Sequence, residues 1–256
     1  MSFVLDAVDS KIRMLVDNAF SQGVLSSSGH AGPRYVPQRS TDWRTTTRWL
    51  SDSSGEQFLE SDQVPQNAPI NCLAVAGHNL GAIGAEARLQ YHDGTAWQDA
   101  HAPVSPPDNS PFVVLFSDRQ HDRWRLLIDA QEPASISVLA AGDTLEFPEG
   151  ARPPIEPANL NPEAEMLGGP TEGGEIPGMG VIRKGHRQQL SLDLLDPRWV
   201  RDTWQPIRER LLGQGVFLFW NYENFSEDVI FGNLFSASVS QTAWYNELDL
   251  EIRGKA

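Results

Sequence analysis

The pair His78-Asn79 is the strongest polar signal in this sequence, and it directly follows the apolar run 72–77. An imidazole beside a carboxamide can both donate and accept hydrogen bonds, as recognition of a sugar hydroxyl or of a partner's backbone requires. Trp97 follows the alternating segment 85–91, and its indole could stack on a sugar ring. We therefore predict a ligand or partner loop that contains His78, Asn79 and Trp97. The alternatives are a turn in which Asn79 bonds its own backbone, and an indole that packs in a core or a subunit interface.

Motifs that carry catalysis are not found in this sequence. There is no His-Glu-x-x-His pair, no Gly-x-Ser-x-Gly elbow and no P-loop. Glu223, Glu227 and Asp228 could supply the two carboxylates of a glycosidase. Acidic residues in so acidic a chain more often form solvated surfaces, so we predict that the protein is not an enzyme and has no cofactor.

The charge of the chain disfavours two classes of partner. Asp+Glu 34 against Lys+Arg 20 gives a formal net charge of −14. Such a chain repels nucleic acid and anionic membranes over most of its surface, although a local basic patch could exist on one face. We expect no specific nucleic-acid binding and no membrane insertion, because no apolar stretch approaches the length of a membrane span.

Cysteine and histidine usage limits the chemistry further. Cys72 is the only cysteine, which excludes a disulfide within the chain, and its apolar surroundings predict a small buried side chain. His121-Asp122 beside Asp118 could bind a cation, but a polar turn explains the same residues, and we predict no metal site. The N-terminus has no basic segment ahead of an apolar run, so we expect synthesis in a reducing cytosol.

Residues 41–148 are predicted to form a β-sandwich. Short segments rich in β-branched and aromatic residues are separated by connections with Pro and Gly, as in sandwiches and jelly rolls. They lie at 41–50, 70–76, 85–91, 111–116, 123–128 and 135–141. Asp93-Gly94 is a strong hairpin signal. The predicted fold class is therefore mainly β.

Three further segments flank this sandwich. Residues 1–40 contain one short strand or helical turn and then a loop at 24–40, and this segment could pack with the C-terminal domain. Residues 149–180 are rich in Pro and Gly, and they are either an extended linker or an arm that wraps a neighbouring subunit. Residues 181–256 are predicted to form a smaller α+β domain, whose helix begins at Asp196-Pro197 and kinks near Pro206.

The sandwich segment resembles the discoidin-like, galactose-binding-type jelly rolls of minor tail and baseplate proteins of long-tailed phages. The similar motifs are Thr47-Arg-Trp-Leu50, Gly77-His-Asn-Leu80, the turn Asp93-Gly94 with Trp97, and Arg123-Trp-Arg-Leu-Leu-Ile128. The segments 196–199, 216–221 and 248–254 also resemble such tail proteins.

The resemblance implies a structural virion protein at the tail tip or baseplate of a siphophage, assembled in the host cytoplasm. It would self-associate into a sixfold or threefold ring and join the tail tube or hub to distal-tail, fibre or receptor-binding proteins. The terminal strands at 3–5 and 248–252 could pair between copies. The alternative function is a carbohydrate-binding module that attaches to glycans on the host surface.

Overall fold

The chain folds into two compact units. In the computed structural model, one unit is Arg13–Glu146 and the other combines Phe147–Ala256 with Met1–Ile12. We call them the sandwich unit and the α+β unit. The structure describes residues 11–66, 69–153, 155–157, 160, 162–167, 180–211, 214–222, 225–242 and 244–255.

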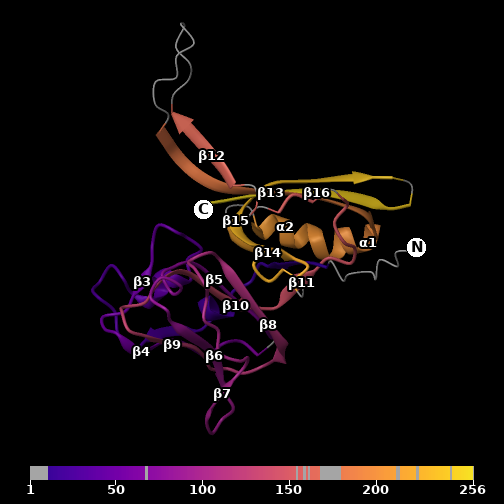
Figure 1. Cartoon of the computed structure of the whole chain (residues 1–256). Coiled ribbons are helices and arrows are strands. Elements are labelled where there is room, and N and C mark those ends of the chain that lie inside the picture. Colours follow the sequence, from indigo (N-terminus) through magenta and orange to yellow (C-terminus); the bar gives the residue numbers. More distant parts are fainter. Residues whose placement is uncertain are drawn as a thin grey trace, which may run out of the picture. The chain divides into compact units, whose positions relative to one another are not determined.

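Two antiparallel sheets form the sandwich unit (Figure 1). The four-stranded sheet has the order β3 (Trp49–Leu50), β10 (Ser135–Gly142), β5 (Ile70–His78) and β8 (Phe112–Arg119). The five-stranded sheet has the order β2 (Val24–Ser27), β4 (Gly55–Asp62), β9 (Trp124–Ala130), β6 (Glu86–His92) and β7 (Trp97–Asp99). In addition, β1 (Ile12–Leu15) pairs with β11 (Thr144–Glu146), and two 3-10 turns are present, η1 (Ala19–Gln22) and η2 (Pro37–Ser40).

The core of the sandwich unit consists of apolar side chains from both sheets and from η1. Trp49, Trp124, Leu126 and Ile136 are fully buried members of this cluster, together with Phe20. The two indole N–H groups are satisfied, because that of Trp49 donates to the carbonyl of residue 29 at 3.0 Å and that of Trp124 to the carbonyl of residue 121 at 2.8 Å. Buried tryptophans with paired N–H groups add apolar contact without an unsatisfied donor.

The α+β unit is an antiparallel sheet with a helix against one of its faces (Figure 1). The strand order is β14 (Gly215–Trp220), β15 (Val229–Gln241), β16 (Asn246–Lys255), β13 (Gly180–Leu195) and β12 (Pro162–Leu167). The helix consists of α1 (Pro197–Trp199), the π-helical turn η3 (Val200–Trp204) and α2 (Gln205–Leu211).

Side-chain alternation explains which sheet face is buried in this unit. Leu190, Leu248 and Leu250 point to the core, whereas the residues between them on β13 and β16 are polar. Trp204 of the helix is fully buried and its ring lies 5.6 Å from that of Phe147. One face of the sheet is therefore apolar and covered, and the opposite face is polar.

The sequence prediction of a mainly β chain, with a β-sandwich and a smaller α+β domain, is confirmed. The predicted strands at 70–76, 85–91, 111–116, 123–128 and 135–141 correspond to β5, β6, β8, β9 and β10. The helix begins where predicted, since Asp196 accepts a hydrogen bond from the amide of Arg198 at 2.6 Å. Its irregularity is the π-helical turn ahead of Pro206, which has no N–H to complete a regular turn.

Several local predictions were wrong. Residues 24–40 are not all loop, because β2 is an edge strand of the five-stranded sheet and η2 is a 3-10 turn. Of the strand expected over 41–50, only Trp49 and Leu50 are in a strand, β3. The backbone of Trp43 adopts a left-handed φ of 59°, which interrupts an extended conformation. Residues 162–167 form β12, paired with β13, so an extended linker is wrong over these residues, and the alternative of an arm stays a prediction. The predicted strand at 3–5 lies outside the described residues.

Candidate ligand-binding site

His78 lies at the end of β5 and its imidazole is used inside the sandwich unit. Nδ1 accepts a hydrogen bond from the amide of Leu80 at 3.2 Å, so in the neutral ring Nε2 carries the proton and donates to the carbonyl of Ser110 at 2.9 Å. The residue is only 6% exposed. Burial lowers the pKa of His78, against weaker opposing effects of the Ser110 carbonyl and of Asp108. The imidazole is therefore a neutral bridge between two loops.

Asn79 connects the end of β5 to the start of β10. Its Oδ1 accepts from the amide of Ser135 at 2.8 Å, and its Nδ2 donates to the carbonyl of Pro133 at 3.0 Å. The preceding Gly77 has a φ of 61°, and a Cβ there would lie 2.9 Å from Cβ of Ser137. The conformation therefore requires glycine at this position.

Trp97 lies in β7, at the edge of the other sheet. The guanidinium of Arg125 lies 4.3 Å from the centroid of its indole and that of Arg123 lies 5.4 Å away, while His92 approaches at 5.2 Å in an edge-on arrangement. No hydrogen bond or ring contact joins Trp97 to His78 or Asn79. The ligand role of these three residues stays a prediction, and the contacts described above all serve the fold.

The other candidates from the sequence are dispersed. The ring of His121 stacks on that of Tyr91 at 4.1 Å, and Asp118 accepts from Asn71 at 3.2 Å. Within the part of the chain that the structure describes, no group of His, Cys, Asp and Glu side chains is arranged to hold a metal ion. Glu223 lies outside that part, and the residues around Asp228 form the turn that enters β15. No helix among the described residues is long and apolar enough to cross a membrane.

A site that the sequence reasoning missed lies beside β3 in the sandwich unit. It is a depression of about 670 Å³ that we call the cationic pocket. It is lined by Pro33, Arg34, Tyr35, Arg39, Thr45, Thr46, Thr47, Arg48 and Ser137. Pockets of this size accommodate small ligands, and this one combines an aromatic ring with hydroxyl and guanidinium donors.

Asp42 holds the loop that forms one wall of the cationic pocket. Its two carboxylate oxygens accept from the hydroxyl of Thr47 at 2.9 Å and 2.8 Å, and Oδ1 accepts from the amide of Arg44 at 3.1 Å. Trp43, between them, has a φ of 59°, which is an outlier for a bulky side chain. Such strained residues persist where surrounding contacts hold them in place. The loop is therefore fixed before any ligand arrives.

The opposite wall is tied to β3 through backbone hydrogen bonds. The amide of Ala31 donates to the carbonyl of Leu50 at 3.0 Å, and the amide of Tyr35 donates to the carbonyl of Gly32 at 2.9 Å. The guanidinium of Arg48 lies 5.8 Å from the centroid of the Tyr35 ring. These contacts place the ring and the guanidinium side by side at the pocket.

The charge of the cationic pocket contrasts with that of the chain. Residues 34–48 contain four arginines and Asp42 as the single acidic residue. Arg34 and Arg48 are exposed and have no carboxylate within ion-pair distance among the described residues. Arg39 is 3.8 Å from Asp42, whose oxygens already hold the loop. The signal in the sequence is this local excess of arginine, which spans the predicted loop at 24–40 and the predicted strand at 41–50.

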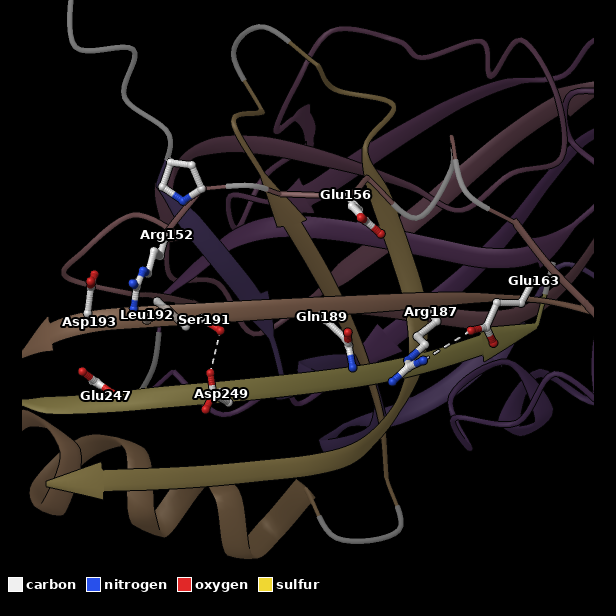
Figure 2. Close-up of a pocket in the computed structure, with 11 residues that line it drawn as sticks. Arg152, Glu156, Glu163, Arg187, Gln189, Ser191, Leu192, Asp193, Glu247 and Asp249 are labelled. Atoms are coloured by element: carbon white, nitrogen blue, oxygen red, sulfur yellow. Dashed lines mark hydrogen bonds and ion pairs between the residues drawn. The ribbon is translucent and has the colours of Figure 1, made fainter.

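A second depression lies on the polar sheet face of the α+β unit (Figure 2). Its volume is about 790 Å³ and its lining consists mainly of charged and amide side chains of β12, β13 and β16. These groups pair with one another: Ser191 donates to Asp249 at 2.6 Å, and Arg187 lies 3.8 Å from Glu163 and 2.9 Å from Glu251. Because Ser191, Gln189 and Arg187 already have acidic partners and no aromatic ring is part of the lining, this face is the weaker candidate.

Comparison with known proteins gives likenesses in fold only. No protein-family model matches the chain, and no curated protein matches it either. Solved structures similar to half of the chain include chitosan-binding module 1 of a Paenibacillus sp. IK-5 chitosanase/glucanase, with 16% identity and a TM-score of 0.41 over 50% of this chain and 99% of that one. A pectin-binding carbohydrate-binding module has 18% identity and a TM-score of 0.40, over 47% and 89%.

A CBM32 module from Clostridium perfringens, solved with GalNAc-β-1,3-galactose, is similar at 12% identity and a TM-score of 0.42, over 49% of this chain and 98% of that one. The ligands named are those of these proteins. These three structures are carbohydrate-binding modules, and a Ruminococcus gnavus GH29 fucosidase is also similar, at 11% identity and a TM-score of 0.42 over 50% of this chain and 27% of that one. None of them supports the resemblance to phage tail proteins.

Proposed function

We propose that the sandwich unit is a carbohydrate-binding module that attaches the protein to a glycan surface. The observation that carries this proposal is the cationic pocket, where a partly exposed aromatic ring, Tyr35, lies beside the exposed guanidinium groups of Arg34 and Arg48 and the hydroxyls of Thr45 and Thr46. Sugars offer hydroxyl groups to such donors and an apolar ring face to such an aromatic side chain. The pocket is fixed in advance by the Asp42 contacts, which lowers the entropy lost on binding.

Affinity electrophoresis of the purified full chain through gels that contain defined polysaccharides tests this proposal. Tyr35→Ala removes the aromatic wall, whereas the matched control Gln189→Ala alters the depression of the α+β unit. Retardation that is lost in Tyr35→Ala and kept in Gln189→Ala would support the proposal. Equal retardation of all three proteins would place glycan binding elsewhere, and no retardation on any glycan would refute it.

A second candidate function is a structural component of a phage tail tip or baseplate, and a specific feature of β15 favours it. β15 pairs with β14 only over 229–233. From Leu234 to Gln241 its hydrogen bonds within the described sheet run to β16 alone. This open edge contains no charged residue and no proline, although natural edge strands are commonly protected by both. An unprotected edge of this length suits pairing with a strand of another copy.

Large apolar side chains are exposed on β15 and on the connection that follows it. Phe235 is 62% exposed, and Trp244 at the connection to β16 is 87% exposed. Leu194 is also exposed and lies next to Leu195, which pairs with Asn246 just after that connection. If this edge makes a heterologous contact whose rotation closes, the copies form a ring, and such a ring would join a tail tube or hub to fibres.

Light scattering and negative-stain imaging of the purified chain test this second function. Val239→Lys places a charge on the open edge of β15. The matched control Gln189→Lys places the same charge on an exposed position of β13, which pairs with β16 there and is not part of the β15 edge. We expect rings or other defined oligomers in the unmodified chain and in the control, and dissociation in Val239→Lys. A monomer at all concentrations would contradict the assembly role.

A further inference from the structure

We infer that the sugar residue held in the cationic pocket carries a carboxylate, so that the ligand is a uronic-acid-containing oligosaccharide. This inference rests on the proposed carbohydrate binding and narrows it to one class of ligand. It starts from a contrast within the sandwich unit. Arg13 and Arg123 each contact a glutamate at 3.1 Å and 2.7 Å, as expected in a chain with an excess of acidic residues.

Arg34 and Arg48 lack such a contact in the described part of the chain, although 34 acidic residues are available. Their guanidinium groups line a depression that no described acidic side chain enters, since Asp42, the one carboxylate of this segment, bonds Thr47 and the amide of Arg44. The positive charge therefore remains uncompensated at the pocket. A ligand that supplied a carboxylate would provide the missing counter-charge.

A neutral sugar would fit the cationic pocket less well. Any ligand that fills the depression removes water from Arg34 and Arg48, and loss of hydration without an opposite charge is unfavourable. A carboxylate compensates for the lost hydration, because its two oxygens accept hydrogen bonds from the planar guanidinium group. The nearby hydroxyls of Thr45 and Thr46 then remain for the ring hydroxyls of the same sugar.

The net charge of −14 does not exclude an acidic ligand at this position. At physiological ionic strength charges further away than about 8 Å are largely screened, so the charges nearest the ligand dominate. Within residues 34–48 the balance is four arginines against one aspartate. A short oligosaccharide with few charges suits this arrangement better than a long, densely charged nucleic acid, which the rest of the surface repels.

The test is isothermal titration calorimetry of the full chain with three probes: trigalacturonate, neutral galactotriose and a sulfated galactotriose trisaccharide that contains no uronic acid. We expect trigalacturonate to bind most tightly and its affinity to fall as salt is added. Arg34→Gln and Arg48→Gln should each lower the affinity for trigalacturonate by about tenfold or more, because each removes one charge-assisted contact. Arg88→Gln is the matched control, since it removes an arginine of the same unit outside the cationic pocket.

Failure of this inference can be separated from failure of the proposed function. If galactotriose or the sulfated trisaccharide bound more tightly than trigalacturonate, the uronate assignment would be overturned. The proposal of carbohydrate binding would stand as long as Tyr35→Ala abolished that binding. Trigalacturonate binding that is unchanged in the double variant of Arg34 and Arg48 would also overturn the inference. Absence of binding to all three probes and to the gel polysaccharides would overturn both. Circular dichroism of each variant checks that the sandwich is folded.

Discussion

Replacing Asn79 by alanine separates a structural role of this residue from the ligand role that its sequence context suggests. In the structure both polar atoms of its side chain bridge to the segment that opens β10. Asn79→Ala removes the acceptor of the Ser135 amide and the donor to the Pro133 carbonyl. The nearby pocket of Arg34 and Arg48 is not touched by this change.

The expected loss of stability follows from these two bonds. Each hydrogen bond contributes about 0.5–1.5 kcal/mol, and a buried N–H left without an acceptor costs about 1–3 kcal/mol. Ser135 is 7% exposed, so its amide has little access to water in place of Asn79. The sum, allowing for relaxation, is about 2–3 kcal/mol. A change of that size shifts an opening equilibrium by about thirtyfold or more.

Hydrogen exchange followed by mass spectrometry measures this shift in the intact protein. Peptides that cover β5 and β10 should lose protection by about thirtyfold in Asn79→Ala. Peptides from the α+β unit serve as an internal reference, and Gln98→Ala, an exposed change on β7, should alter protection by less than about threefold. Unchanged protection of β5 and β10 would refute the structural role and return Asn79 to the candidate ligand loop.

Three further predictions concern the same unit. Burial lowers the pKa of His78 below its ordinary value of 6.5, so as pH falls the unfolded chain binds this proton before the folded chain does. The free energy of unfolding should therefore decrease as pH drops through about 6.5. In denaturant melts, His78→Gln should reduce this dependence on pH. Gly77→Ala should destabilise the sandwich by about 1–3 kcal/mol, because it combines a left-handed φ with a clash against Ser137; unchanged melting would contradict this. Asp42→Ala should weaken glycan binding by about tenfold, since it frees the loop held through Thr47, while Tm changes little; equal affinity would show that the loop is not part of the site.

The strands of the sandwich could be predicted because their apolar pattern is local. The run around Val75 is apolar over a full strand length, and the segment around Leu89 alternates, and both are strands of the predicted burial. The segment 41–50 misled the same reasoning. Its threonines and tryptophans favour a strand, but the Asp42 contacts with Thr47 and Arg44 close it into a turn, and tertiary context overrides propensity.

The roles of polar residues were harder to predict, because their partners are distant in sequence. Asn79 contacts residues 54 and 56 positions away, and His78 contacts a carbonyl 32 positions away. No local pattern encodes such a bridge, so a structural polar residue and a ligand residue look alike. The cationic pocket was missed for a related reason: Ser137 of β10 completes a wall that otherwise comes from 33–48.

The two proposed functions use surfaces on different units, which makes their combination testable. If copies associate through the open edge of β15, each assembly presents several cationic pockets, and linked sites raise apparent affinity for a polymer by about 10²–10⁴. Val239→Lys should therefore reduce retention on polygalacturonate while leaving the affinity for trigalacturonate unchanged. Arg48→Gln should lower both and leave the oligomer intact. If Val239→Lys lowered the trisaccharide affinity as well, the edge of β15 and the pocket would be coupled, and two independent surfaces would no longer describe this protein.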